Sequence, residues 1–273
     1  MTEDSLHYDG TLAVIGGGRM GEAIVGGLVR SGAVSADRIT IAEPSADRRE
    51  ALASAFGVRC VADGADALPA DTVILAVKPQ VIDAVATSLS TGLSGSVVVS
   101  IAAGITCARL EALLPGDAAV VRVMPNTPAL VGEGMSVISG GTEATAEQTE
   151  IVRGLFSALG KAVVMDERYQ DAASAISGSG PAYFALVVDA LARGGVRQGL
   201  PRDVAQMLAV QTMLGTAKLL DDTGMHPEAL VDGVTSPGGT TIAAVEALES
   251  RAVRSAFGEA VAAAVHRAKE LGS

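Results

Sequence analysis

The hydrophobic positions of the chain follow one pattern up to about Asp166 and a different pattern after it. In the first part, short apolar and β-branched runs alternate with stretches of helical periodicity, which predicts buried strands joined by helices in a parallel sheet. These runs occupy residues 11–15, 38–43, 72–77, 96–103, 119–124, 135–139 and 161–165. From residue 169 to residue 273 the pattern is helical, with breaks at SGSGP, GLP, GMHP and DGVTSPGGTT. We therefore predict an α/β domain over residues 1–166 and an all-α domain over residues 167–273.

The composition narrows the classes of function. The formal net charge is -11 and the 20 basic residues form no long run, so a nucleic-acid-binding surface is not expected. The segment MTEDSLHYDG is acidic without an apolar signal core, and the longest apolar run, AYFALVVDALA, is shorter than a membrane span. Cys60 and Cys107 lie far apart in apolar contexts, which favours two inert buried thiols over a disulfide. These features predict a soluble cytoplasmic protein that binds neither nucleic acid nor a membrane.

The strongest local motif is LAVIGGGRMG, in which Gly16, Gly18 and Gly21 form G-x-G-x-x-G between a predicted strand and a predicted helix. In this context the first glycine permits a tight turn, the second leaves room for a pyrophosphate, and the third lets the helix pack closely on the strand. The free N–H groups and the positive dipole end of the helix would attract the pyrophosphate. We predict dinucleotide binding here, and a purely structural turn is the alternative.

The second predicted strand ends at Glu43, where the ribose of a bound adenosine is expected. An acid at this position accepts hydrogen bonds from a free 2′-hydroxyl and repels a 2′-phosphate, which favours NADH slightly. Arg48 and Arg49 follow within a helical turn and could instead receive the phosphate, although both could also be solvated on a helix face. The cofactor is therefore predicted to be NADPH or NADH, with the preference undecided.

Small and polar residues also follow the next predicted strands. Lys78 and Pro79 come after one buried strand, and Ala102–Gly104 come after the following one. Because ligands of open α/β sheets bind at the carboxyl ends of the strands, these residues are expected near the nicotinamide ribose. The turn PNTP adds Asn126 at the same edge, where it would also make sense as a turn alone.

No metal site and no nucleophile constellation is predicted. His7, His226 and His266 are isolated, and neither cysteine neighbours a histidine. The chemistry is therefore expected to belong to the cofactor, with the protein orienting it against a substrate. One motif is still without a role, namely DGVTSPGGTT at residues 232–241, in which hydroxyl residues surround a proline and two glycines at the start of a predicted helix.

The motifs IGGGRMG, AVKP, SIAAG, MPNTPA, SGSGPAY and SPGGTT occur in the order and spacing of pyrroline-5-carboxylate reductases, and the chain resembles this family from about Thr11 to Leu271. The glycine fingerprint is generic, but the pair SGSGPAY and SPGGTT is specific. The resemblance implies a Rossmann-like amino-terminal domain and a helical dimerisation domain that interlocks with its partner in a homodimer, often assembled into a decamer. It also implies an oxidoreductase of proline biosynthesis, which reduces the cyclic imine 1-pyrroline-5-carboxylate to L-proline with NADPH or NADH.

The residue patterns and the resemblance together assign the site residues. The predicted cofactor-binding residues are Ile15, Gly16, Gly17, Gly18, Arg19, Met20, Glu43, Ala76, Val77, Lys78, Pro79, Ile101, Ala102, Ala103 and Asn126. The predicted substrate-binding residues are Ser236, Gly238, Gly239, Thr240, Thr241 and Glu167, of which Thr241 and Ser236 are the catalytic candidates. The chain departs from relatives at Glu43, where many have a small hydroxyl residue, and at Gly233, where some have asparagine.

The implied substrate gives DGVTSPGGTT a physical role, because it is a small ring with one carboxylate and one imine nitrogen. Backbone N–H groups of Gly238, Gly239 and Thr240, aided by the Ser236 hydroxyl, would hold the carboxylate at a helix start. The Thr241 hydroxyl would bind the ring nitrogen, orienting the imine or relaying a proton from water. A helix cap built from the same serine and threonines is the structural alternative.

Two other functions remain as alternatives. A related hydroxyacid dehydrogenase would need a lysine on the first helix of the second domain, and SGSGPAYFALVVDALARGG contains none. A non-catalytic dinucleotide sensor would keep the glycine loop but would not need SPGGTT.

Overall fold

The computed structural model describes residues 7–272, and the chain divides into two compact units. One unit runs up to Ser179 and includes the residues from Ala264 onward, and the other comprises Gly180–Ala263. The predicted boundary near Asp166 lies just after the last strand, whereas helix α6 (Gln170–Ser177) packs on strand β7 (Gly134–Gly140) of the first unit. The domain division at residue 166 stays a prediction.

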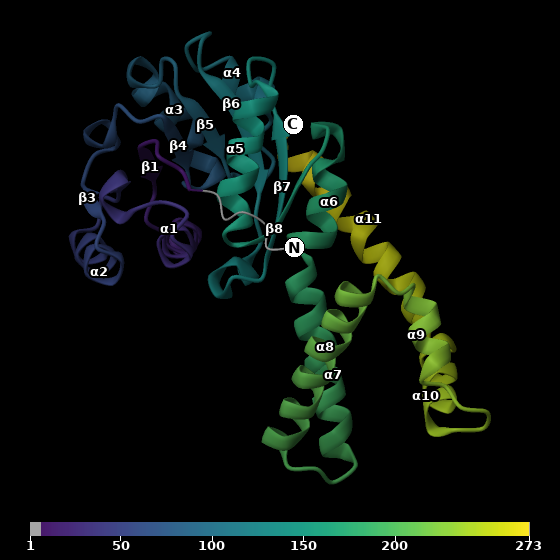
Figure 1. Ribbon diagram of the computed structural model, residues 1–273. Helices are drawn as coiled ribbons and strands as arrows, with labels where there is room; N and C mark the ends of the chain where they lie inside the picture. The colour runs from purple at the N-terminus through teal and green to yellow at the C-terminus, as the bar shows by residue number, and fades with distance from the viewer. Residues whose placement is uncertain (1–6, 273) are drawn as a thin grey trace. The chain divides into compact units, whose positions relative to one another are not determined.

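The first unit is built on an eight-stranded sheet in the order β3-β2-β1-β4-β5-β6-β7-β8 (Figure 1). The strands are β1 (Leu12–Ile15), β2 (Ile39–Ala42), β3 (Arg59–Val61), β4 (Thr72–Leu75), β5 (Val97–Ser100), β6 (Ala119–Met124), β7 (Gly134–Gly140) and β8 (Gly160–Val164). All pairings are parallel except the pairing of β6 with β7. The predicted α/β class is confirmed.

Two details of the predicted sheet are wrong. The sheet is not wholly parallel, because the connection from Met124 to Gly134 is shorter than the dozen or more residues that a parallel crossover needs. Strand β3 was missed, because it has only three residues at the edge of the sheet and its first side chain, Arg59, is exposed. Such a strand lacks the apolar run by which the buried strands are recognised.

Side chains alternate between two hydrophobic clusters, one on each face of the sheet, because successive Cβ atoms of a strand point to opposite sides. In β1, Leu12 and Val14 belong to one cluster, and Ala13 and Ile15 belong to the other. Helices α1 (Arg19–Ser31), α2 (Ala46–Phe56) and α5 (Ala146–Ser157) contribute to the first cluster, and α3 (Ile82–Leu89) and α4 (Cys107–Glu111) contribute to the second. Both faces are therefore covered, which explains the unbroken apolar runs of the central strands.

Short 3₁₀ helices join several of these elements. They are η1 (Ala36–Arg38), η2 (Gly64–Ala67), η3 (Pro79–Val81), η4 (Ser90–Gly92), η5 (Thr127–Val131) and η6 (Glu167–Tyr169).

The elements after β8 are helical, as predicted. After η6 and α6 they are α7 (Gly180–Arg197), α8 (Arg202–Thr223), α9 (Pro227–Gly233), α10 (Thr240–Glu249) and α11 (Val253–Gly272). Four of the breaks between these helices fall at the predicted motifs, and the fifth, at residues 250–252 between α10 and α11, was not predicted. Helices α7 and α8 lie side by side as a helical hairpin (Figure 1), and α11 contributes residues to both units.

The second unit leaves much of its apolar surface uncovered. Within residues 180–263, all of which the structure describes, the buried hydrophobic side chains are three alanines, Ala192, Ala205 and Ala209. Larger side chains are exposed instead, including Phe184, Leu186 and Leu191 of α7 at 59%, 71% and 57% of their full accessible surface. A helical unit of this kind has no core of its own within the monomer.

One stretch, Glu167–Arg197, is long and apolar enough to cross a membrane by length and composition alone. The sequence had predicted no stretch of this length, because the apolar run AYFALVVDALA was counted by itself. In the structure α6 and α7 follow one another with only Gly178 and Ser179 between them, and the combined stretch is longer than that run.

Candidate active site

The glycine loop joins β1 to α1 at the carboxyl edge of the sheet. Gly16 has a φ of +114°, and a Cβ built there would lie 2.7 Å from the carbonyl oxygen of Ala76. A Cβ at Gly21 would lie 2.1 Å from the carbonyl oxygen of Gly16. Packing within the chain therefore requires both glycines. A Cβ at Gly18 would meet no atom within 4 Å, so the protein's own packing gives no reason for the middle glycine.

The start of α1 fits an anionic ligand. Gly18 is the N-cap residue, and no side chain caps the helix. The N–H groups of the first turn, which includes Arg19 and Met20, thus have no side-chain acceptor, and they lie at the positive end of the helix dipole. Open space at Gly18 beside these donors is what a dinucleotide pyrophosphate requires.

A cavity of about 270 Å³ lies next to this loop. Its lining includes Gly16, Pro44 and Val77, which follow β1, β2 and β4. Gly16 and Val77 are predicted cofactor-binding residues and Pro44 follows a third, so residues after three separate strands meet at one edge of the sheet. Asp63 and Gly64 also line the cavity. The sequence did not indicate these two residues because the strand before them, β3, was not predicted.

Glu43 follows β2 directly, and its carboxylate turns back toward the glycine loop. The backbone N–H of Gly17 donates a hydrogen bond of 3.1 Å to Oε2, and that of Ser45 donates one of 2.9 Å to Oε1. The acid thus lies beside the loop at the end of the second strand, where the ribose of a dinucleotide is expected.

Arg48 and Arg49 are not merely solvated on a helix face. The Arg48 Nε atom donates to the carbonyl oxygen of Gly17 over 2.8 Å, and its Nη2 atom pairs with Oε2 of Glu22 at 2.6 Å. Arg49 donates from Nη1 to the carbonyl oxygens of Glu43 and Pro44, at 2.8 Å and 2.7 Å. One arginine therefore contacts the glycine loop and the other closes the turn between β2 and α2.

The ends of β4 and β5 present small residues at the same edge. The Ala76 N–H continues the ladder by donating to the carbonyl oxygen of Ile15 over 2.9 Å. Lys78 is exposed, Ala102 is buried, and Ala103 is exposed beyond it. The carboxyl ends of β4 and β5 are therefore followed by small residues and by the exposed Lys78.

Asn126 has a structural role in the protein. Its Nδ2 atom donates to the carbonyl oxygen of Ser177 over 3.0 Å, and its Oδ1 atom accepts from the Met135 N–H over 2.8 Å. The side chain thus ties the turn after β6 to β7 and to the end of α6. A contact of Asn126 with the cofactor stays a prediction.

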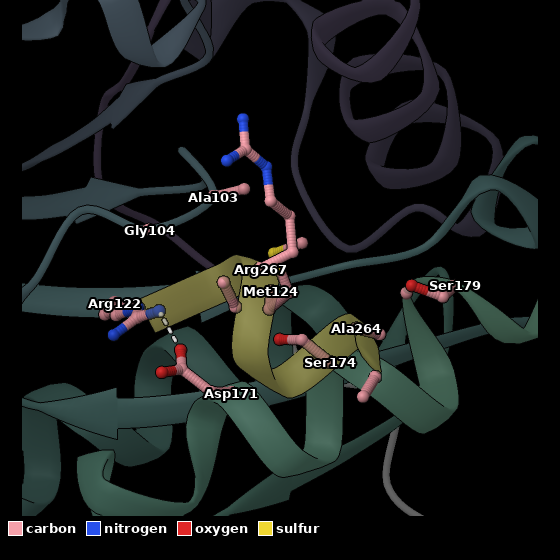
Figure 2. A pocket seen from close by; sticks show the side chains of 12 residues that line it. Ala103, Gly104, Arg122, Met124, Asp171, Ser174, Ser179, Ala264 and Arg267 are labelled. Atoms are coloured by element: carbon pink, nitrogen blue, oxygen red, sulfur yellow. Dashed lines mark hydrogen bonds and ion pairs between the residues drawn. The ribbon is translucent and has the colours of Figure 1, made fainter. Parts of the chain in front are cut away.

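A second cavity, of about 310 Å³, lies beside the β5–α4 loop (Figure 2). Arg122 of β6 lines it with a side chain that is only 6% exposed, and it pairs with Asp171 at 3.4 Å (Figure 2) and with Glu167 at 3.1 Å. Ser174 also lines the cavity, and its hydroxyl oxygen is buried without a hydrogen-bond partner among the described residues. The sequence analysis missed Arg122, although a single arginine inside the apolar run AVVRVM was a signal.

Glu167 is held within the first unit. Its Oε1 atom accepts from the backbone N–H of Cys107 over 2.9 Å in addition to the pair with Arg122. The role of Glu167 in substrate binding stays a prediction.

The Ser236–Thr241 loop lies in the second unit and leads into α10. Gly238 has a φ of +68°, and Gly239 is the N-cap residue in extended conformation, with no side-chain hydrogen bond capping the helix. A Cβ at Gly239 would lie 2.4 Å from the Ser236 hydroxyl oxygen, so this hydroxyl is next to the helix start. The predicted serine or threonine cap is therefore absent. The N–H of Gly239 donates to the carbonyl oxygen of Ser236 over 3.0 Å, so it is not free, contrary to the prediction, whereas the other N–H groups of the helix start have no side-chain acceptor.

The two cysteines are free thiols. Cys107 is buried, and burial raises the pKa of its thiol to about 12, which makes it inert as predicted. Cys60 is only partly buried, and burial raises the pKa of its thiol as well. Across residues 7–272, no group of three or more histidine, cysteine, aspartate or glutamate side chains could hold a metal ion.

Comparisons with known proteins agree with this geometry. A family model described as pyrroline-5-carboxylate reductase dimerisation matches residues 167–271, and one described as NADP oxidoreductase, coenzyme F420-dependent, matches residues 11–104. The pyrroline-5-carboxylate reductase of Synechocystis sp. is 46% identical over 96% of this chain and 98% of its own length. That of Escherichia coli is 40% identical over 95% and 97%.

Solved structures show the same similarity. The pyrroline-5-carboxylate reductase of Coxiella burnetii matches with a TM-score of 0.92 and 36% identity, over 97% of this chain and 100% of its own. The pyrroline carboxylate reductase of Plasmodium falciparum, solved with NADP bound, matches with a TM-score of 0.88 and 28% identity, over 98% and 100%. With full-length relatives at this level of identity, and with its glycine loop and Ser236–Thr241 loop shaped as described, the chain belongs to the pyrroline-5-carboxylate reductase family.

Proposed function

We propose that the chain reduces 1-pyrroline-5-carboxylate to L-proline with NADH or NADPH, the reaction for which its family is named. The observation that carries the proposal is the match to reductases of this name over 96% of the chain, because it extends across both domains. Helix α7 carries no lysine, so the hydroxyacid dehydrogenase alternative lacks its expected base.

The glycine loop and its neighbours form the proposed cofactor site. Residues Gly16–Met20 hold the pyrophosphate through the helix start, and Glu43 meets the adenosine ribose. Residues Ala76–Pro79 and Ile101–Ala103 border the nicotinamide side. When bound, the reduced dinucleotide supplies the hydride that the imine carbon accepts.

The start of α10 forms the proposed carboxylate site. The N–H groups there have no side-chain acceptor, and the Ser236 hydroxyl lies beside Gly239. Because the Gly239 N–H donates to the carbonyl oxygen of Ser236, Gly238 and Thr240 supply the amides proposed for the carboxylate. A helix N-terminus attracts an anion without a cationic side chain, which suits a chain with a net charge of -11. The chain itself requires the glycines of SPGGTT, because Gly238 has a φ of +68° and a Cβ at Gly239 would meet the Ser236 hydroxyl. The lack of side chains at both positions also leaves room for the ring.

Thr241 is the proposed partner of the imine nitrogen. It lies in the first turn of α10, beyond the carboxylate-binding amides, and its hydroxyl makes no hydrogen bond to other described residues. A hydroxyl is too weak an acid to give up a proton freely at neutral pH. Thr241 therefore orients the imine or relays a proton from water to the nitrogen.

The helical unit supports an oligomer, and the finer proposal is a homodimer. With three buried alanines as its hydrophobic interior, residues 180–263 need a partner to cover Phe184, Leu186 and similar side chains. The family model for residues 167–271 is a dimerisation model, which supports the same view. Five such dimers could form a decamer.

The cytoplasm is the proposed location. The apolar length of Glu167–Arg197 is explained by subunit contact instead of a membrane, because this stretch lies within the region matched by the dimerisation model. Helix α7 also carries ionic side chains, including the Asp189–Arg193 pair at 2.6 Å, and these would lie at the solvent-exposed rim of such an interface.

A steady-state assay tests the function directly. With racemic pyrroline-5-carboxylate and either NADH or NADPH, we expect imine-dependent oxidation of the dinucleotide and an equal amount of proline. Dinucleotide binding without imine-dependent oxidation would identify a non-catalytic sensor and contradict the proposal.

Gly18→Ala should weaken binding of both NADH and NADPH by roughly ten- to a hundredfold, because the new methyl group occupies space that the pyrophosphate needs. The free energy of unfolding without cofactor should change by less than about 1 kcal/mol, since the methyl meets no protein atom. Gly21→Ala is the matched control and should destabilise the fold itself by about 2 kcal/mol or more. Calorimetric titration and thermal unfolding measure both effects, and unchanged cofactor affinity in Gly18→Ala would remove the loop from the cofactor site.

The dimer should be obligate. Sedimentation velocity over a wide dilution series is expected to show no folded monomer, because the apolar surface of the helical unit would be exposed in it. A stable and active monomer at low concentration would show that the unit does not depend on a partner.

Thr241→Ala should lower kcat/KM for the imine by roughly ten- to a thousandfold, the range for a positioned polar contact that strengthens in the transition state. Thr241→Ser keeps the hydroxyl and should retain most of the activity. Dinucleotide affinity and thermal stability should barely change in either variant. If alanine supports the same kcat/KM as serine, Thr241 does not contact the reacting imine.

A further inference from the structure

The ion pair between Arg48 and Glu22 connects the first turns of two helices at the glycine loop. Helix α1 follows β1 and helix α2 follows β2, and because these strands are parallel neighbours, both helices begin at the same edge of the sheet. Arg48 reaches from α2 to Glu22 of α1, with Nη2 at 2.6 Å from Oε2, while its Nε atom donates to the Gly17 carbonyl oxygen over 2.8 Å. The two side chains are 33% and 36% exposed.

Both backbone polar groups of Gly17 make hydrogen bonds to side chains. Its N–H donates to Glu43 over 3.1 Å and its carbonyl oxygen accepts from Arg48 over 2.8 Å. The acid that favours a 2′-hydroxyl and the base that could bind a 2′-phosphate therefore lie next to the same residue.

We propose that Glu22 is a specificity-determining residue: by pairing with Arg48, it withholds the guanidinium from a 2′-phosphate and shifts the preference of the cofactor site toward the 2′-hydroxyl dinucleotide. This inference rests on one part of the proposed function, namely that a dinucleotide binds at the glycine loop. It adds Glu22 to the cofactor-site residues, because neither the sequence pattern nor the family resemblance pointed to it.

The geometry of the guanidinium supports this role. An arginine binds phosphate most strongly with two parallel hydrogen bonds from one edge. The Nε–Nη2 edge of Arg48 is filled by the Gly17 carbonyl oxygen and by Glu22. A 2′-phosphate must therefore either displace Glu22 or use the remaining edge beside a carboxylate.

The local charges point the same way. Around Gly17, the carboxylates of Glu22 and Glu43 lie beside the guanidinium of Arg48, and Glu22 is paired with it. The Nη1 atom of Arg49 donates to the carbonyl oxygens of Glu43 and Pro44, and Arg19 is exposed at the start of α1. Each of the two carboxylates repels a 2′-phosphate more than a 2′-hydroxyl, so removal of either negative charge favours the phosphate.

Binding of NAD⁺ and NADP⁺ to the intact protein tests the proposal without the imine. The affinities are measured by calorimetric titration for the wild-type chain, for Glu22→Gln and for Glu50→Gln. Glu50 is an exposed residue of α2, so its substitution is the same chemical change without the contact to Arg48. Glu43→Ser serves as the comparison that removes the other acid.

We expect Glu22→Gln to raise the affinity for NADP⁺ relative to NAD⁺ by about three- to tenfold, in the same direction as Glu43→Ser. Glu50→Gln should leave the ratio unchanged. In an Arg48→Met background, which keeps an unbranched apolar stem but removes the guanidinium, the gain from Glu22→Gln should shrink to about twofold or less. That loss of the gain is expected only if Glu22 acts through Arg48.

Three results would overturn the inference. The ratio could stay unchanged in Glu22→Gln, it could fall, which would mean that Glu22 positions Arg48 for the phosphate, or it could rise equally with and without Arg48. These outcomes are separate from failure of the proposed function. A chain that binds both dinucleotides but does not reduce the imine would still have a measurable ratio of NADP⁺ affinity to NAD⁺ affinity.

Discussion

The close approach of α1 to the ends of β1 and β4 is the constraint on which the cofactor site depends. It leaves no space for a side chain at Gly16 or Gly21, where a Cβ would lie within 2.7 Å and 2.1 Å of carbonyl oxygens. The first turn of α1 is thereby fixed at the carboxyl edge of the sheet, with N–H donors that have no side-chain acceptor. Glu43 and Arg48 both contact Gly17, and Glu22 pairs with Arg48, because the two helices begin at the same edge of the sheet.

The second unit lacks a hydrophobic core of large side chains. Its interior contains alanines, and its large apolar side chains, such as Phe184 and Leu186, are exposed. The Ser236–Thr241 loop belongs to this unit, so the proposed substrate contacts depend on a part of the chain for which we propose a partner subunit. Assembly and catalysis are therefore expected to be linked in this protein.

Much of this could be predicted from the sequence, because the strongest signals are local. Unbroken apolar runs marked the buried strands, and glycine and proline marked the helix breaks and both ligand loops. The antiparallel direction of β7 follows from the short connection before it, and β3 forms only by pairing at the edge of the sheet. Neither feature has a signature in the local sequence. The pairing of Arg122 with Glu167, and of Arg48 with Glu22, joins residues that are distant in the sequence, and a single sequence does not show such pairs.

The family resemblance supplied what local signals could not, namely the identity of the substrate. The residues of SPGGTT alone did not indicate a ligand. The implied substrate, a small ring with one carboxylate, led to the prediction that amides at this helix start bind an anion, and the structure shows that start without a side-chain cap at Gly239. The absence of a serine or threonine cap is the detail that favours a ligand over a structural role for this loop.

The central claim is that a hydride passes from the nicotinamide to the carbon of the cyclic imine while the nitrogen gains a proton from the solvent side. The most direct measurement uses NADH carrying deuterium at both C4 positions, with pyrroline-5-carboxylate in ordinary water, and mass spectrometry of the proline formed. The account predicts one deuterium per proline, located on the δ carbon, and ordinary hydrogen on the nitrogen. Proline without deuterium, or oxidation of NADH without proline, would contradict it.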